Sequence, residues 1–180
     1  MKTASLIFFY FGEDSYVNRL AQEAVPLHRA MEGYDHTTLL YHPTHAGPFE
    51  LSKKAHEAAE FAVIPTKENF VWALQRLSGK GYDAIDVFIF SHGSPKSFIS
   101  SKGTYGDSEF CTSGYLAQKL TEPIKGLRLV YQVNCYGSTL NPFWLSIGAR
   151  AAVGTRDVNF YPTRFNRFIK YLPSDFIQSF

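Results

Sequence analysis

Three stretches of the sequence are nearly all apolar over the length of a β-strand, which leaves them without a polar face. They cover residues 4–11, 84–90 and 127–133. Strands of this kind are typical of parallel sheets, where both faces are buried, whereas half-exposed strands alternate apolar and polar residues. Helix-like patterns separate these strands along the chain, as parallel connections require. The sequence therefore predicts an α/β domain with a mostly parallel sheet.

The remaining patterns complete this architecture. Two more strands, over residues 37–41 and 151–155, give a sheet of five or six strands with the order 2-1-3-4-5 and right-handed crossovers. Helices are expected over residues 14–31, 52–61, 113–120, 142–147 and 163–171, and another begins at Thr66; residues 98–110 have the pattern of a hairpin. Helices on both faces make this a three-layer sandwich. A chain of 180 residues suits one domain, residues 1–180.

The charge of the chain excludes some function classes. With 18 basic and 16 acidic residues the net charge is +2, which does not predict a nucleic-acid surface. No apolar run reaches the length of a membrane span. The first run is too short for a signal peptide, and Gly12-Glu13-Asp14 follows it, so we expect a core strand there.

Cysteine use points to a reducing compartment. Cys111 and Cys135 are the two cysteines of the chain, too few for a disulfide framework, although a single bridge between them remains open. We therefore expect a cytoplasmic protein. Cys111 falls in or just after the expected hairpin and is interpreted as a packing residue.

Two of the apolar strands end in similar short motifs. The strand over 84–90 continues into Ser91-His92-Gly93, and the strand over 127–133 continues into Asn134-Cys135-Tyr136-Gly137. Ligand sites of open α/β sheets lie beyond the carboxyl ends of the strands. If the two strands are parallel neighbours, His92 and Cys135 lie at that edge together.

This pair of side chains has a defined chemistry. A nearby imidazole favours the thiolate form of a cysteine and later protonates a leaving group. Gly93 lets a substrate carbonyl approach the backbone, and its N–H together with that of Cys135 is predicted to form an oxyanion hole.

Plainer readings compete with this one. A cysteine at a strand end is usually a small buried apolar residue, and a loop histidine usually lies at the surface. No metal or other cofactor is expected: His42 and His45 lack further ligands at a recognised spacing. Ser91 and Ser94 do not stand in a Gly-x-Ser-x-Gly elbow, which argues against a serine hydrolase.

The two motifs resemble those of the caspase-like (clan CD) cysteine peptidases, which include caspases, legumains, gingipains, separases and CHAT-domain proteins. The chain matches the Cys-x-Gly of the caspase motif, and the 43 residues from His92 to Cys135 are close to the caspase spacing. Residues 147–155 are similar to the strand that follows the catalytic cysteine in CHAT-type members. The resemblance implies a cysteine endopeptidase in which Cys135 is the nucleophile, His92 transfers the proton, and the substrate is a protein or peptide.

The chain also departs from the family. Gln132 lies three residues before Cys135, one position earlier than the caspase glutamine, and no linker for activating cleavage is evident. Caspase-like dimerisation and processing are therefore not expected, and the sequence does not indicate an oligomeric state.

The resemblance also implies where the substrate pocket lies. Its residues come from the ends of the first strand, the cysteine-bearing strand and the next strand. The matching candidates are Glu13, Asp14, Gln132, Arg156 and Asp157. Three carboxylates favour basic side chains in the substrate, whereas Arg156 would favour acidic ones or would neutralise Asp157. Exposed loop charges are an equal alternative.

Two further readings of the whole chain stay open. One is an inactive family member that binds a peptide or partner protein in the same cleft. The other is a flavodoxin-like binding domain in which His92 and Cys135 meet by chance.

Overall fold

The computed structural model describes residues 1–11, 33–41, 59–62, 64–104 and 106–158. Its strands are β1 (Thr3–Tyr10), β2 (His36–Tyr41), β3 (Ala59–Ala62), β4 (Ala84–Ser91), β5 (Gly93–Ser94), β6 (Ser97–Ser101), β7 (Ser108–Thr112), β8 (Leu127–Gln132) and β9 (Ala151–Gly154). Its helices are α4 (Lys67–Gly79), α5 (Ser113–Lys119), the 3₁₀ turn η2 (Gly137–Leu140) and α6 (Asn141–Ser146).

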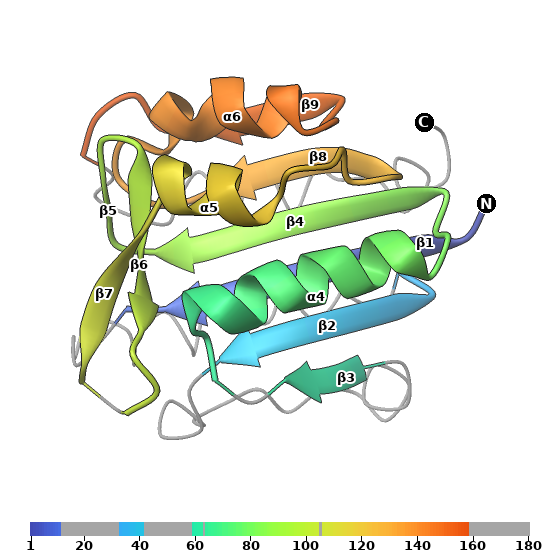
Figure 1. Cartoon of the computed structure of the whole chain (residues 1–180), viewed down its shortest axis with the longest axis horizontal. Coiled ribbons are helices and arrows are strands. Elements are labelled where there is room, and N and C mark those ends of the chain that lie inside the picture. The colour runs from blue at the N-terminus through green and yellow to red at the C-terminus, as the bar shows by residue number, and fades with distance from the viewer. Residues whose placement is uncertain (12–32, 42–58, 63, 105, 159–180) are drawn as a thin grey trace.

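The larger sheet has the predicted architecture. Its order is β3-β2-β1-β4-β8-β9, and every neighbouring pair is parallel (Figure 1). Leaving out β3, this is the predicted 2-1-3-4-5. The mostly parallel α/β fold is thus confirmed, with β3 added at one edge.

The apolar runs are buried as their composition requires. All eight residues of β1 and all eight of β4 are buried, so neither strand has a solvent face. Alternate side chains of these strands, such as Leu6, Phe8, Val87 and Ile89, form a continuous core with the helices. Phe8 packs edge-on against Phe70 of α4 at 5.5 Å. This core occupies the face of the sheet on which α4 and α5 lie (Figure 1).

Helix α4 begins where the sequence predicts. Thr66 is its N-cap, and the Thr66 hydroxyl accepts a hydrogen bond from the Asn69 N–H at 3.1 Å. Phe70, Leu74 and Leu77 form its buried stripe. Helix α6 contributes Trp144 to the same core. The expected helices over residues 14–31 and 163–171 lie outside the described residues.

One predicted helix, over residues 52–61, is wrong in the part that the structure describes, residues 59–61. A short helix was expected over residues 52–61, but residues 59–62 form β3, which pairs with β2 in the register Thr37↔Ala59. Backbone pairing at the edge of the sheet overrides the weak helical preference of this short segment. Residues 52–58 lie outside the described residues.

The expected hairpin is part of a second sheet. Strands β5, β6 and β7 pair antiparallel, in the register Gly93↔Phe98 and Ser97↔Thr112. Figure 1 shows this small sheet beyond the carboxyl ends of β4 and β8, to which the strand arrows point. The small sheet therefore lies next to the edge of the larger sheet at which His92 and Cys135 were expected.

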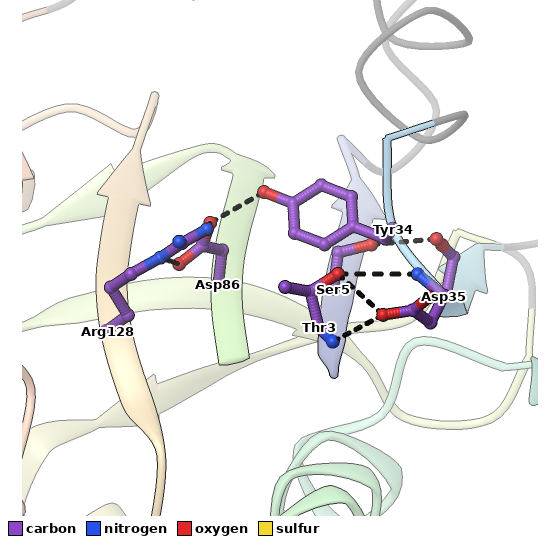
Figure 2. A network of polar contacts seen from close by, with 7 residues as sticks. Thr3, Ser5, Tyr34, Asp35, Asp86 and Arg128 are labelled. Carbon is purple, nitrogen blue, oxygen red and sulfur yellow. Dashed lines mark hydrogen bonds and ion pairs between the residues drawn. The ribbon is translucent and has the colours of Figure 1, made fainter. Parts of the chain in front are cut away.

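A β-bulge and a buried ion pair lie at the opposite end of β4 and β8. Ile85 is level with Leu127 but Asp86 is level with Leu129, so Arg128 is an extra residue in β8. The Arg128 guanidinium donates to Asp86 at 2.9 and 2.5 Å, and Tyr34 Oη donates to the same carboxylate at 2.6 Å (Figure 2). Each charge buried here has an opposite charge and hydrogen bonds, which burial requires.

The two cysteines are not bridged: Cys111 is a buried free thiol and Cys135 a half-buried one. None of the helices in the described ranges is both long and apolar enough to cross a membrane.

Candidate active site

Strands β4 and β8 bring the two predicted motifs to the same edge of the sheet. They are adjacent and parallel, Ile89 is level with Gln132, and the Val133 N–H donates to the Ile89 carbonyl at 2.8 Å. The offset at this point is 132 − 89 = 43 residues, the same as the 135 − 92 = 43 between His92 and Cys135. Both residues therefore leave their strands at the same level.

Gly93 joins the two motifs by backbone contact. A methyl group on its Cα would lie 2.6 Å from the carbonyl oxygen of Cys135 and 2.6 Å from Nδ2 of Asn134. Real Cβ atoms do not approach backbone this closely, so no other residue fits here without moving one of the two segments. The segment that carries His92 thus lies directly against the turn that carries Cys135.

The half-buried His92 is held by the small sheet and by the first strand. Its carbonyl accepts a hydrogen bond from the Ile99 N–H of β6 at 2.9 Å. Its ring packs edge-to-face on Phe11, with centroids 5.3 Å apart at 86°. An aromatic ring held this way limits where the imidazole can turn.

The turn after Cys135 contains a strained residue. Tyr136 has φ 55° and ψ 20°, the left-handed region that residues with a Cβ adopt at an energetic cost. Its N–H donates to the Asp157 carbonyl at 3.0 Å, and the Ser138 N–H donates to the Thr155 carbonyl at 3.0 Å. Such strain persists where surrounding contacts enforce it, and it clusters at functional sites.

The end of β9 supports this turn from the other side. A methyl group at Gly154 would lie 2.4 Å from the carbonyl carbon of Gly137 and 2.4 Å from the Ser138 nitrogen. Residues 155–157, which the resemblance places beside the cysteine, accordingly run along the turn and hydrogen bond to it. The tight contact explains a glycine at the end of this strand.

Asn134 is a functional candidate that sequence reasoning missed. It is fully buried, and its Nδ2 donates to the Cys135 carbonyl at 3.3 Å, with a longer contact of 3.5 Å to the Ser97 carbonyl. Its Oδ1 is buried without a hydrogen-bond partner in the described part of the chain, which costs about 1–3 kcal/mol. The visible signal was an amide residue between an apolar strand and a cysteine.

Gln132 lies beneath the turn, where the fold uses its side chain fully. Trp144 Nε1 donates to its Oε1 at 3.1 Å, and its Nε2 donates to the Gly137 carbonyl and to Asn141 Oδ1, both at 3.0 Å. The residue is 2% exposed. The structure therefore uses the Gln132 side chain to support the turn, and its contact with a substrate stays a prediction.

The other pocket candidates divide into two groups. Arg156 and Asp157 are exposed directly beside the Cys135 turn. Glu13 and Asp14 lie outside the described residues, as do His42 and His45. Across the ranges described, no group of three or more His, Cys, Asp or Glu side chains could hold a metal ion.

Cys111 has the environment of a packing residue. It is fully buried in the core, and this burial raises the pKa of its thiol far above the ordinary value. The Cys111 thiol is therefore protonated at neutral pH, and of the two cysteines Cys135, half-buried in the turn, is the more exposed.

The sequence matches no family model and no curated protein. Among solved structures, the chain is similar to a secreted C11 cysteine protease from Bacteroides thetaiotaomicron, solved in complex with an irreversible peptide inhibitor. The identity is 12% and the TM-score 0.47, and the match covers 88% of this chain and 50% of that one. The chain thus spans about half the length of that protein, and its function has to be inferred from its own residues.

Proposed function

We propose that this chain is a cysteine peptidase in which Cys135 is the nucleophile and His92 is the acid–base residue. The contact of Gly93 with the Cys135 carbonyl supports this proposal most directly, because it joins the two motifs at the edge of the sheet where α/β folds bind ligands. The buried state of Cys111 leaves Cys135 as the thiol able to react.

The proposed reaction has two steps. The sulfur of Cys135 attacks the carbonyl carbon of a peptide bond, and its proton passes to His92, which returns it to the departing amine as the C–N bond breaks. Water then attacks the thioester carbonyl and gives a proton to His92. His92 passes that proton to the sulfur as the C–S bond breaks, which releases the acid and restores the free thiol. The N–H groups of Gly93 and Cys135 stabilise the oxyanion in both steps.

Cleavage of a peptide library, read by mass spectrometry, tests this proposal. The wild-type chain should cut a set of peptides that the Cys135→Ala variant leaves intact. If the wild type binds peptides but cuts none, the chain is an inactive member that uses the same cleft for binding. If it neither binds nor cuts, the paired motifs have no peptidase role.

The preferred substrate side chain is proposed to be Lys or Arg at the cleavage site. The exposed Asp157 beside the Cys135 turn supports this choice, and the exposed Arg156 next to it opposes it. Fluorogenic peptides that differ only at that residue separate the two. A preference for Asp over Arg would show that Arg156 governs the pocket.

A further inference from the structure

The peptide group before Cys135 is held by the side chain of Thr155, the residue that follows β9. The Asn134 carbonyl accepts a hydrogen bond from Thr155 Oγ1 at 2.7 Å and another from the Gly137 N–H at 3.2 Å. In a planar trans peptide the following N–H points opposite to this carbonyl. By holding the Asn134 carbonyl, Thr155 therefore fixes the direction of the Cys135 N–H.

The peptide group after Cys135 is held on both of its sides. Its carbonyl, that of Cys135, accepts from Nδ2 of Asn134 at 3.3 Å. Its N–H, that of Tyr136, donates to the Asp157 carbonyl at 3.0 Å. Asn134 thus takes part in fixing both peptide planes that flank Cys135, one through its backbone and the other through its carboxamide.

We infer that Thr155 and Asn134 are positioning residues for the oxyanion hole. Two hydrogen bonds, from Thr155 Oγ1 to the Asn134 carbonyl and from Asn134 Nδ2 to the Cys135 carbonyl, are called the Thr155–Asn134 clamp below. The inference rests on the proposed function, since it assigns the clamp to the Cys135 N–H used there. The unpartnered Oδ1 of Asn134 is consistent with it, because a buried polar group without a protein partner is rare and a role at a reactive site is one explanation for it. The Thr155 hydroxyl donates its proton to the Asn134 carbonyl at 2.7 Å.

The clamp acts on one kind of reaction and not on another. Acyl transfer to Cys135 develops an oxyanion, so it depends on where the Cys135 N–H points. Alkylation of the same thiol by iodoacetamide develops no oxyanion and depends on the thiolate alone. Measuring both reactions in one variant therefore distinguishes a change in the orientation of the Cys135 N–H from a change in the reactivity of the Cys135 sulfur.

Thr155→Val and Thr155→Ser form a matched pair for this test. Valine keeps the shape of threonine without the hydroxyl, and serine keeps the hydroxyl without the methyl group. The probe is p-nitrophenyl acetate, and the measured quantity is the rate of p-nitrophenol release that depends on Cys135, with Cys135→Ala as the baseline. We expect Thr155→Val to react roughly tenfold or more slowly, since loss of one oxyanion donor lowers rates by about 10²–10³. Thr155→Ser should stay close to wild type, and all three proteins should react alike with iodoacetamide.

Asn134→Leu is the second variant, for the case that Thr155→Val does not fold. Leucine has a similar branched shape and removes both the unpartnered Oδ1 and the long Nδ2 hydrogen bond to the Cys135 carbonyl. The two effects on stability oppose each other, so the melting temperature should stay close to that of the wild type while the acylation rate falls.

Several results would overturn the inference. Acylation of Thr155→Val at the wild-type rate would do so, as would equal losses in the valine and serine variants, since these would assign the effect to packing. A parallel loss of iodoacetamide reactivity would place the effect at the sulfur. If the wild type itself acylates no faster than Cys135→Ala, the proposed function fails and the clamp fails with it.

Discussion

Gly93 is the residue at which the two halves of the candidate site meet. Gly93→Ala should lower the free energy of unfolding by about 1–3 kcal/mol, because the added methyl group meets the Cys135 carbonyl and one of the two segments has to shift. The same change should slow alkylation of Cys135 by separating the two segments. Urea unfolding and iodoacetamide labelling measure these effects.

Gly79→Ala is the control for Gly93→Ala. A methyl group there has nothing within 4 Å, and Gly79 is the last residue of α4, so alanine should be neutral or slightly stabilising. Equal stability of the two variants would contradict the close approach at Gly93.

The roles of the two cysteines are separable by single substitutions. Cys135→Ala and His92→Ala should each abolish peptidase activity with little change in melting temperature, because both residues lie in turns after the strands. Cys111→Ala should retain activity and melt at a lower temperature, because it leaves a small cavity in the core. Activity on a cleaved peptide and thermal melts decide this, and full activity in Cys135→Ala would remove the nucleophile assignment.

Residue roles at the site were only partly predictable. The positions of His92, Gly93 and Cys135 follow from strand ends, which the apolar runs mark clearly. The placement of Gln132 depends on Trp144 and Asn141 of α6. The proposed role of Asn134 depends on Thr155, the residue after β9. Contacts between elements of this kind are set by tertiary packing, and no local pattern shows them.

At the scale of elements, α4 shows how a local signal survives in the fold. Thr66→Ala should lower the free energy of unfolding by about 1 kcal/mol, because the Asn69 N–H loses its acceptor. Peptidase activity should not change. Chemical denaturation measures the difference, with Thr121→Ala at an exposed position outside the helices as the control. Equal effects of the two changes would mean that the cap does not stabilise α4.

The strands and helices with strong local signals were predicted well, and weak segments were not. Strand β4 was expected over 84–90 and runs Ala84–Ser91, and α5 was expected over 113–120 and runs Ser113–Lys119. Strand β3 was missed because its four residues gain their conformation from pairing with β2, a partner distant in the sequence.

At the scale of the whole molecule, the buried Asp86–Arg128–Tyr34 network links stability to pH. Burial, followed by the charge of Asp86, raises the pKa of Tyr34 well above its ordinary value. A raised pKa contributes stability that is complete below the unfolded-state value, about 10, and is lost as pH rises above it. The network should therefore stabilise the fold at neutral pH and lose this contribution in alkali.

Tyr34→Phe tests this link. At pH 7 the variant should be less stable by about 1.5–3 kcal/mol, the range for a hydrogen bond to a charged group. The gap should narrow above about pH 10, because the tyrosine ionises only in the unfolded wild type. Urea unfolding of both proteins from pH 8 to pH 11, in steps of about one pH unit, measures the difference in stability. A stability difference between the two proteins that does not change with pH would contradict the raised pKa of Tyr34. Ionisation of the other tyrosines affects both proteins equally and does not contribute to this difference.

The extra residue of β8, Arg128, also determines which face of the sheet each later side chain of that strand lies on. Leu127 and Val130 both belong to the core beneath the helices although they are three apart, so alternation is inverted between them. Before the bulge the two strands differ by 127 − 85 = 42 residues, and after it by 132 − 89 = 43. With an offset of 42, His92 would stand level with Asn134, and the amide and the thiol would exchange faces of the sheet. A single residue at the far end of the strand thus decides whether residue 134 or residue 135 is level with His92.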